Sequence, residues 1–307
     1  MIRRVPLLVA GVAAAAVLSS CSTFDTSAAA RVAGDSIDER VVQTLLAGPE
    51  DVADATVSRT ALDGTQARLA LSQLILARIA EQIADRYDLD LSKARAADQA
   101  ATKENLTGER LTRWTALTDE ERDLISDFQV AVETLKSAPG NAPANLEQRY
   151  RNPESTGYFC IRYVAFQTEA QAVAALSRIR GGEEFASVAD EFNEEKSGGV
   201  AGGPDGSPCV ALDQFRPPNL PAPLADALYA ATPGETTDPV QVVGASGSAW
   251  FLLLHRPWSE IGTDLATKVA EAPAFAEYLA AVAVSRAEVA SRYGTWDAIS
   301  ASVVQHS

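Results

Sequence analysis

The sequence has few of the residues that build metal sites or histidine-based catalytic sites. Its 307 residues include two His, three Cys and one Met, so any site that needs an imidazole depends on His255 or His306. Basic residues are also scarce, because 26 Lys and Arg stand against 41 Asp and Glu, a formal net charge of −15. This charge repels phosphates, which argues against nucleic acid as the main partner and disfavours an anionic membrane surface. No metal ion and no organic cofactor is implied.

Apolar residues, in contrast, are plentiful. They make up 47% of the chain against 22% charged residues, so the chain can bury a core and is not a disordered polymer. The length suggests about two domains. After the first twenty residues, no hydrophobic segment is long enough to span a membrane.

The start of the chain has the order of an export signal. Arg3 and Arg4 precede an apolar run over residues 5–18, which is shorter than the about 20 residues of a membrane span. The following Leu-Ser-Ser-Cys, which ends at Cys21, resembles the lipobox of bacterial lipoproteins. That resemblance implies a signal peptide over residues 1–20 and a lipid on Cys21. The alternatives are an ordinary secretory signal with a chance Cys and, for the route, Sec or twin-arginine export.

An exported, lipid-anchored protein lies on the outer face of the cell membrane or in the periplasmic space. Residues 21–30 are rich in Ser, Thr and Ala, and we expect them to form a tether between the lipid and the folded body. With Cys21 lipidated, Cys160 and Cys209 remain as an even pair in a disulfide-permissive compartment. We therefore predict a disulfide between them, with Cα atoms about 4.4–6.8 Å apart. The alternative is two buried free thiols.

Residues 31–150 are predicted to be mainly helical. Apolar residues recur every three or four positions over residues 65–87, which predicts one long amphipathic helix. A second helix is expected over residues 92–105, and a third should begin at a capping box of Thr118 and Glu121. The apolar stripe of the first helix, which includes Leu71, Leu74, Ile75, Ile79, Ile83 and Tyr87, either packs in a helix–helix core or lines a partly exposed groove for unfolded segments.

The segment from Ala30 to Ile37 is predicted to form a short strand, a turn at Gly34 and a helix that begins at Ser36. It resembles the Val-x-Gly-x-x-Ile opening of the N-terminal module of SurA-type chaperones. At the other end, residues 259–307 are expected to form helices, over residues 264–269 and 273–284, that return to this module. Trp296 is expected to be an ordinary core anchor.

Residues 157–258 have a different pattern. We expect a strand over residues 157–166, two helices, a glycine-dense loop, a short helix over residues 222–231, a Pro-Gly-Glu turn and two final strands. This order resembles a parvulin-type peptidyl-prolyl isomerase domain, as found in SurA-type and PrsA-type foldases. The segments that carry the resemblance are Thr168-Glu169-Ala170, Arg180-Gly181-Gly182-Glu183-Glu184-Phe185, Gly202-Gly203-Pro204-Asp205-Gly206 and residues 232–240.

The resemblance also shows what this domain lacks. Parvulins have two facing histidines, a Cys or Asp near the long loop and a Met/Phe pocket for the proline ring. Aligned on the motifs, Tyr163 and Trp250 replace the histidines, Glu195 and Ser197 fall near the Cys/Asp position, and Leu220 and Leu224 replace Met and Phe. His255 is expected to be a surface residue. Catalytic residues are therefore unknown, and Tyr163, Leu220, Leu224 and Trp250 are the candidates for an apolar peptide-binding groove.

Together these features predict an α+β protein, in which a helical module built from both chain ends flanks a parvulin-like domain with a small antiparallel sheet and flanking helices. The function expected from the resemblance is a lipid-anchored chaperone or foldase for unfolded or nascent exported polypeptides. Two alternatives stay open, an active peptidyl-prolyl isomerase and an envelope scaffold that is not a chaperone.

Overall fold

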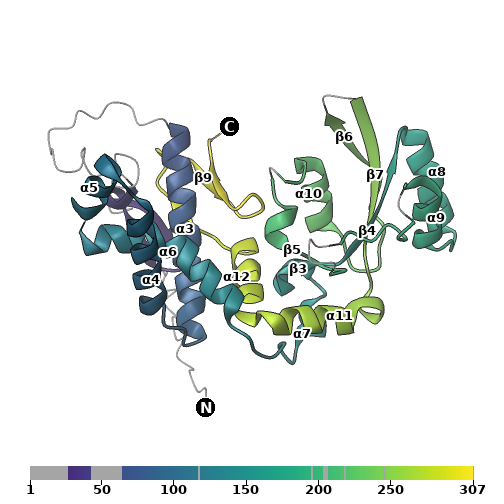
Figure 1. Ribbon diagram of the computed structural model, residues 1–307. Coiled ribbons are helices and arrows are strands. Elements are labelled where there is room, and N and C mark those ends of the chain that lie inside the picture. Colours follow the sequence, from purple (N-terminus) through teal and green to yellow (C-terminus); the bar gives the residue numbers. More distant parts are fainter. Residues whose placement is uncertain are drawn as a thin grey trace, which may run out of the picture.

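The computed structural model combines helices with small antiparallel sheets, so the predicted α+β class is confirmed (Figure 1). It describes residues 27–42, 64–116, 118–194, 196–202, 207–217, 219–244 and 247–306. The predicted signal peptide, Cys21, Glu195 and residues 203–206 of the glycine-dense loop lie outside these residues. Within them, no helix is both long and apolar enough to cross a membrane.

The helical module is organised around the helix α3, Gly64–Arg86. Its predicted stripe is buried, and the residues Leu71, Ile75, Ile79 and Ile83 are each at most 4% exposed, which confirms the helix-core interpretation for them. The helix α6, Asp119–Ser137, packs along it. α4, Ser92–Asn105, has the predicted bounds, and a short helix that was not predicted, α5 (Gly108–Ala116), follows it. The side chain of Glu121 lies outside the described residues, so its capping box stays a prediction.

Both chain ends build this module, through strands as well as helices. β1 (Ala28–Val32) pairs with β2 (Asp35–Asp38) and with β8 (Glu288–Val289) in one antiparallel sheet. The helix α12, Pro273–Ala283, packs against α3 and α6. After it, β9 (Thr295–Asp297) and β10 (Ser302–Val304) form a hairpin against α3.

Two expectations for the ends of the chain were wrong. The tether predicted over residues 21–30 stops earlier, because Ala28, Ala29 and Ala30 belong to β1 and are at most 2% exposed. The helix expected from Ser36 begins only at residue 39, because Ser36 pairs with Arg31 across the hairpin of β1 and β2. The predicted C-terminal helices are present, as α11 (Trp258–Glu271) and α12, but the last twenty residues contain the hairpin of β9 and β10 instead of helix.

Residues 157–258 form a three-stranded antiparallel sheet covered by helices on both faces. β4 (Ile161–Phe166), β7 (Gly247–His255) and β6 (Val240–Gly244) lie in the order β4-β7-β6. α8 (Glu169–Arg180) and α9 (Phe185–Phe192) cover one face, and α10 (Ala222–Ala230) lies on the other (Figure 1). As predicted, Thr168 caps α8, and it forms a capping box with Gln171.

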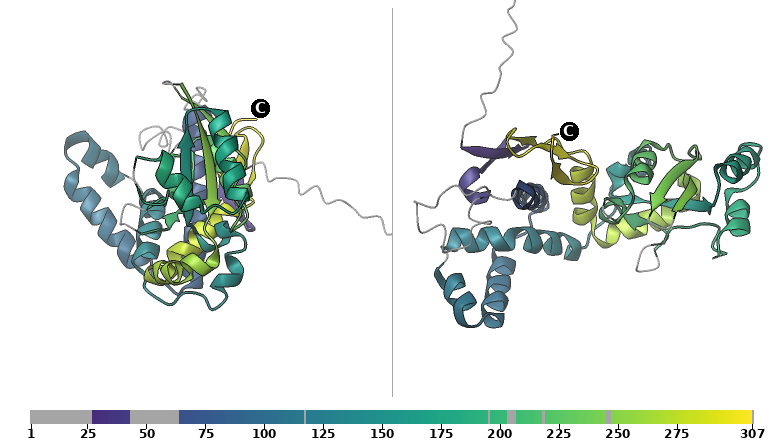
Figure 2. Two further views of the ribbon diagram at one scale, coloured as in Figure 1. Left: turned by 90° about the vertical axis from the view of Figure 1, so that its right-hand side faces the viewer. Right: turned by 90° about the horizontal axis from the view of Figure 1, so that it is seen from above.

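The two parts of the molecule are joined by α7 (Leu146–Arg149), a 3₁₀ turn over Pro153–Thr156, and α11 (Figures 1 and 2). The backbone approaches α12 closely at Gly157, whose φ is +81° and where a Cβ atom would lie 2.3 Å from the Ala276 carbonyl oxygen. The 3₁₀ turn after Val210–Ala211 (β5), Leu212–Phe215, contacts α12 as well. One continuous core therefore runs from α3 through α12 into the sheet face beneath α10.

The predicted disulfide between Cys160 and Cys209 is present. Cys160 sits between β3 (Tyr158–Phe159) and β4, and Cys209 immediately precedes β5, which pairs with β3. The Cα atoms are 4.1 Å apart, slightly closer than expected, and both residues are at most 1% exposed. The bridge therefore fixes the strand that leads into the sheet and has no solvent-exposed thiol chemistry.

Candidate peptide-binding face

The strand register places Tyr163 and Trp250 on opposite faces of the sheet. Tyr163 of β4 pairs with Leu253 of β7, and Trp250 pairs with Phe166. Successive side chains along a strand alternate between faces, so residues three apart on β7 point to opposite sides. Trp250 accordingly packs with Phe166 in the core beneath α8 and α9. The single groove expected from Tyr163, Leu220, Leu224 and Trp250 does not form.

The face that carries Tyr163 is the one beneath α10. Leu253 and Phe251 of β7 share this face, and Leu220 and Leu224 pack into the same core. Leu224 is 6% exposed and Leu220 is partly buried, so both mainly support the face. The aromatic residue of β7 that shares the face with Tyr163 is Phe251, one residue beyond the predicted Trp250.

Tyr163 is held at its backbone and exposed at its side chain. Its N–H donates to the Gly199 carbonyl at 2.7 Å, and its carbonyl accepts a hydrogen bond from Asn193 Nδ2 at 3.0 Å. Asn193 Oδ1 also accepts from the Ala165 N–H at 3.3 Å, so this amide replaces a neighbouring strand along the edge of β4. A Cβ atom at Gly199 would lie 2.3 Å from the Tyr163 carbonyl oxygen, which requires glycine there. Tyr163 as a whole remains 39% exposed.

His255 is buried, which corrects its expected place on the surface. The side chain has no exposed area, because α10 covers it and its ring lies edge-on to Phe159 with centroids 5.0 Å apart. Nε2 is 2.9 Å from the Leu228 carbonyl oxygen, which can only accept, so Nε2 carries the proton. Nδ1 has no partner among the described residues. Burial lowers the pKa of His255 to about 4, so the ring is neutral near pH 7.

This face supplies little acid–base chemistry. In the described strands, the titratable side chains on the Tyr163 face are that phenol and the sealed His255. Ser197 lies near Gly199 at the strand edge, and its carbonyl accepts from the Val200 N–H. No group of three or more metal-ligating side chains occurs in the part of the chain that the structure describes. The arrangement therefore offers an exposed aromatic ring on a rigid apolar support.

Sequence reasoning missed Asn193 and Phe251. No local sequence pattern indicates the role of Asn193, because its side chain hydrogen-bonds to backbone groups 28 and 30 positions away. Phe251 was missed by a one-residue shift in the alignment of the last strand. The alternation of apolar residues could have found it only if the register with β4 had been known.

No protein-family model and no curated protein matches the sequence. Solved structures similar to parts of it include PrsA from Bacillus subtilis, 15% identical over 70% of this chain and 81% of that chain, with a TM-score of 0.27. Another is a peptidylprolyl isomerase (PrsA) from Bacillus cereus, 14% identical over 71% and 82%, with a TM-score of 0.28. A third is the foldase protein PrsA from Streptococcus pneumoniae, 14% identical over 72% and 86%, with a TM-score of 0.26.

Proposed function

We propose that the protein is an exported chaperone or foldase that binds extended, unfolded segments of other exported proteins, without efficient prolyl isomerisation. The observation that carries this proposal is the Tyr163 face, where an exposed aromatic side chain stands on an apolar, rigid support. Isomerisation needs a site that binds the twisted amide better than the planar one. Polar groups poised around Tyr163 would serve that purpose, and the neighbouring strand positions hold Phe251 and Leu253 instead.

The sequence resemblance of residues 157–258 to parvulins supports the kind of ligand in this proposal, an extended polypeptide. Parvulins bind extended chains that contain proline, and the partly buried Leu220 and the buried Leu224 keep the support of the Tyr163 face apolar. The strands and helices of this segment follow one another in the order β4, α8, α9, α10, β6 and β7, the order on which the resemblance rests.

We further propose that Cys21 carries the lipid and holds the protein on the outer face of the cell membrane or in the periplasmic space. β1 begins at Ala28, so at most six residues would separate Cys21 from the folded sheet. A chain of that length spans at most about 20 Å. The body would then stand close to the bilayer.

The test measures aggregation of a chemically unfolded client protein with and without the mature, unlipidated chain, in parallel with isomerisation of a prolyl peptide. We expect the protein, at up to one molecule per client, to slow aggregation. The isomerisation rate of the peptide should stay close to its uncatalysed value. Tyr163→Ala should weaken the suppression several-fold, and Tyr163→Phe should preserve it because the aromatic surface remains.

The matched control is Val173→Ser. Val173 is 48% exposed and lies on α8, which covers the opposite face of the sheet, so this change should leave suppression unchanged. A wild-type kcat/KM typical of parvulins that is lost in Tyr163→Phe would show instead that the protein is an isomerase. Suppression confined to one stoichiometric partner would favour the scaffold alternative.

A further inference from the structure

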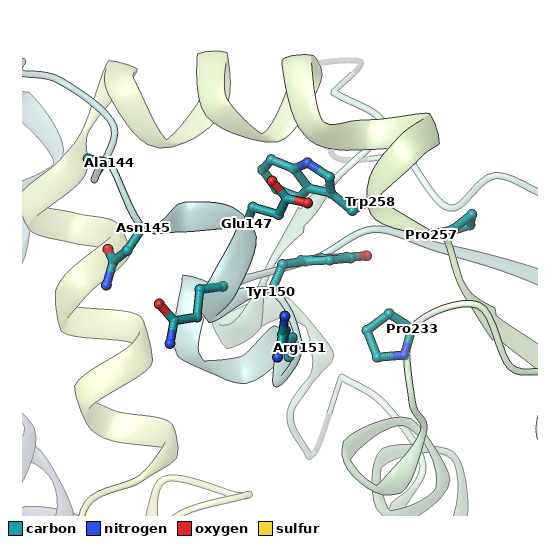
Figure 3. A pocket seen from close by; sticks show the side chains of 9 residues that line it. Ala144, Asn145, Glu147, Tyr150, Arg151, Pro233, Pro257 and Trp258 are labelled. Atoms are coloured by element: carbon teal, nitrogen blue, oxygen red, sulfur yellow. The ribbon is translucent and has the colours of Figure 1, made fainter.

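A cleft lies away from the Tyr163 face, where α7, the turn around Pro233 and the start of α11 meet (Figure 3). Its volume is about 720 Å³, within the range of sites that hold ligands. Trp258 lines it from the start of α11 and is partly exposed, Tyr150 borders it but is buried, and Pro233 and Pro257 lie at one side. Gln148 and Arg151 stand on its rim.

The aromatic pair is held in place by interactions that do not involve the cleft. The Tyr150 hydroxyl donates to the Arg256 carbonyl at 2.8 Å, which fixes the ring, and the Tyr150 and Trp258 centroids are 5.8 Å apart with ring planes inclined by 50°. The Trp258 indole lies along α11 because Gly262 has no side chain. A Cβ atom there would lie 2.8 Å from Trp258 Cε2. Glycine inside a helix costs about 0.5–1 kcal/mol relative to alanine. At this position the helix is therefore less stable than with alanine, and the missing side chain leaves room for the indole.

The prolines are fixed equally well. Pro257 is the residue before α11, and Pro233 belongs to a turn whose Gly234 N–H donates to the His255 carbonyl at 2.8 Å. Both therefore keep their positions relative to the end of β7. The cleft is thus preformed, and a ligand that enters it meets rigid apolar walls at little entropic cost.

The rim provides polar groups without a dominant charge. Gln148, Arg151 and Glu147 are exposed, and the side chains of Gln148 and Arg151 make no hydrogen bond or ion pair with any residue that the structure describes. Arg151 and Glu147 carry opposite charges, so neither an anion nor a cation is favoured overall. Amide and guanidinium N–H groups are donors, which suits a neutral ligand rich in carbonyl acceptors.

We propose that this cleft binds proline-rich segments in the polyproline II conformation, as a second contact for the clients of the proposed function on which this inference rests. Such a segment has three residues per turn and no internal hydrogen bonds, so its carbonyls are free to accept from Gln148 and Arg151. Its pyrrolidine rings pack on aromatic side chains, the mode by which aromatic-lined grooves recognise proline-rich chains. Here Trp258, which is partly exposed, supplies the aromatic surface, and the buried Tyr150 ring packs against it with centroids 5.8 Å apart.

The test follows the indole N–H signals of the four Trp residues of the mature, unlipidated chain by NMR. Trp258 is assigned by the loss of one signal in Trp258→Phe. A decaproline peptide and a Gly/Ser peptide of the same length and charge are titrated separately. We expect decaproline to shift the Trp258 signal in a saturable manner and to leave that of Trp250, beneath α8 and α9, in place. The Gly/Ser peptide should shift neither.

Variants then locate the site. Gly262→Ala should displace the indole and weaken decaproline binding about tenfold, and the rim variant Arg151→Ala about threefold. Arg151 is exposed, so Arg151→Ala keeps the test valid if Gly262→Ala fails to fold. Trp250→Phe is the matched control and should not change the affinity. The inference would be overturned by equal binding of both peptides or by an unshifted Trp258 signal. It would also be overturned if the two single variants, Arg151→Ala and Gly262→Ala, both folded and both kept wild-type affinity.

The two proposals can fail separately. If decaproline shifts Trp258 but the protein does not slow aggregation, the cleft binds proline-rich chains and the proposed chaperone function is wrong. If aggregation is suppressed but Trp258 does not respond to decaproline, the chaperone function stands and the cleft is not the second contact.

Discussion

Arg95 of α4 donates to Glu81 of α3 with its Nη2 atom 2.8 Å from the Glu81 Oε1 atom. Its Nε also donates to Asp127 of α6, so one guanidinium joins three helices. α4 has no buried side chain of its own, and Gln99 adds a hydrogen bond to Asp123 of α6 at 2.7 Å. α4 is therefore attached to the helical module largely through charge.

Arg95→Ala should loosen α4 and lower the free energy of unfolding by about 2–3 kcal/mol, because the partly buried Asp127 carboxylate loses its cation and Glu81 is left with Arg78 alone. Burial already raises the pKa of both Glu81 and Asp127. In the variant these carboxylates should take up protons more readily, so its deficit should be larger near neutral pH than in mild acid. Urea unfolding and amide exchange in α4 measure this. Lys93→Ala, an exposed change on the same helix, should have no effect in either measurement.

His255 should make the fold sensitive to acid. Its pKa is about 4 in the folded protein and about 6.5 when unfolded, so its contribution is complete above pH 6.5 and is lost as pH falls toward 4. The loss should reach about 2 kcal/mol near pH 5 and about 3 kcal/mol below pH 4. His255→Gln, which retains a donor for the Leu228 carbonyl, should remove this part of the pH dependence in urea titrations. His306→Gln, an exposed change near the end of the chain, should retain it.

Loss of the disulfide should destabilise the protein strongly. The bridge links residues 49 positions apart, and closing a loop of that size contributes about 4 kcal/mol on the chain-entropy model. Cys160→Ala/Cys209→Ala should therefore unfold at a clearly lower urea concentration than the parent. In a Cys21→Ala background, thiol titration of the unfolded, unreduced chain should find no free thiol, and two reactive thiols would contradict the bridge.

Cys21→Ala should separate the protein from membranes or leave its precursor uncleaved. The reason is that the thiol is the acceptor for the lipid in the lipobox resemblance, and one or two acyl chains determine whether such a protein stays at a bilayer. Fractionation and labelling with a palmitate analogue test this in cells that express the full chain. Cys160→Ala/Cys209→Ala, which leaves Cys21 in place, should fractionate like the wild type, and unchanged processing of Cys21→Ala would refute the anchor.

Local patterns predicted the helices well and the pairings poorly. The buried stripe of α3 follows from spacings of three and four residues, which a single segment contains in full. Trp250 shows the opposite case, because a shift of one residue along a strand moves a side chain to the other face of the sheet. Which residue of β7 stands beside Tyr163 depends on a register between segments about 90 residues apart, and no local pattern specifies it.

The strands near the C-terminus and the burial of His255 were missed for the same physical reason. β8 and β10 are two and three residues long, and each is stabilised by a distant partner, β1 and α3 respectively. Val303 N–H, for example, donates to Ser72 Oγ at 2.8 Å. His255 is covered by α10, whose position over β7 is a tertiary feature. Strands as short as β8 and β10 have too little intrinsic strand propensity to be recognised from their own sequence.

The pairing of β1 with β8 has a consequence for the order in which the molecule is completed. Arg292, just after β8, reaches back to the Ala28 carbonyl across 264 positions. Under the proposal that the chain is exported and anchored through Cys21, β1 is delivered first, yet its edge stays unpaired until almost the entire polypeptide has crossed. The loop closed by Cys160 and Cys209 is delivered earlier and needs no such wait. Maturation would thus proceed from the middle of the chain outward, and the segment next to the membrane would be the last to become resistant to proteases.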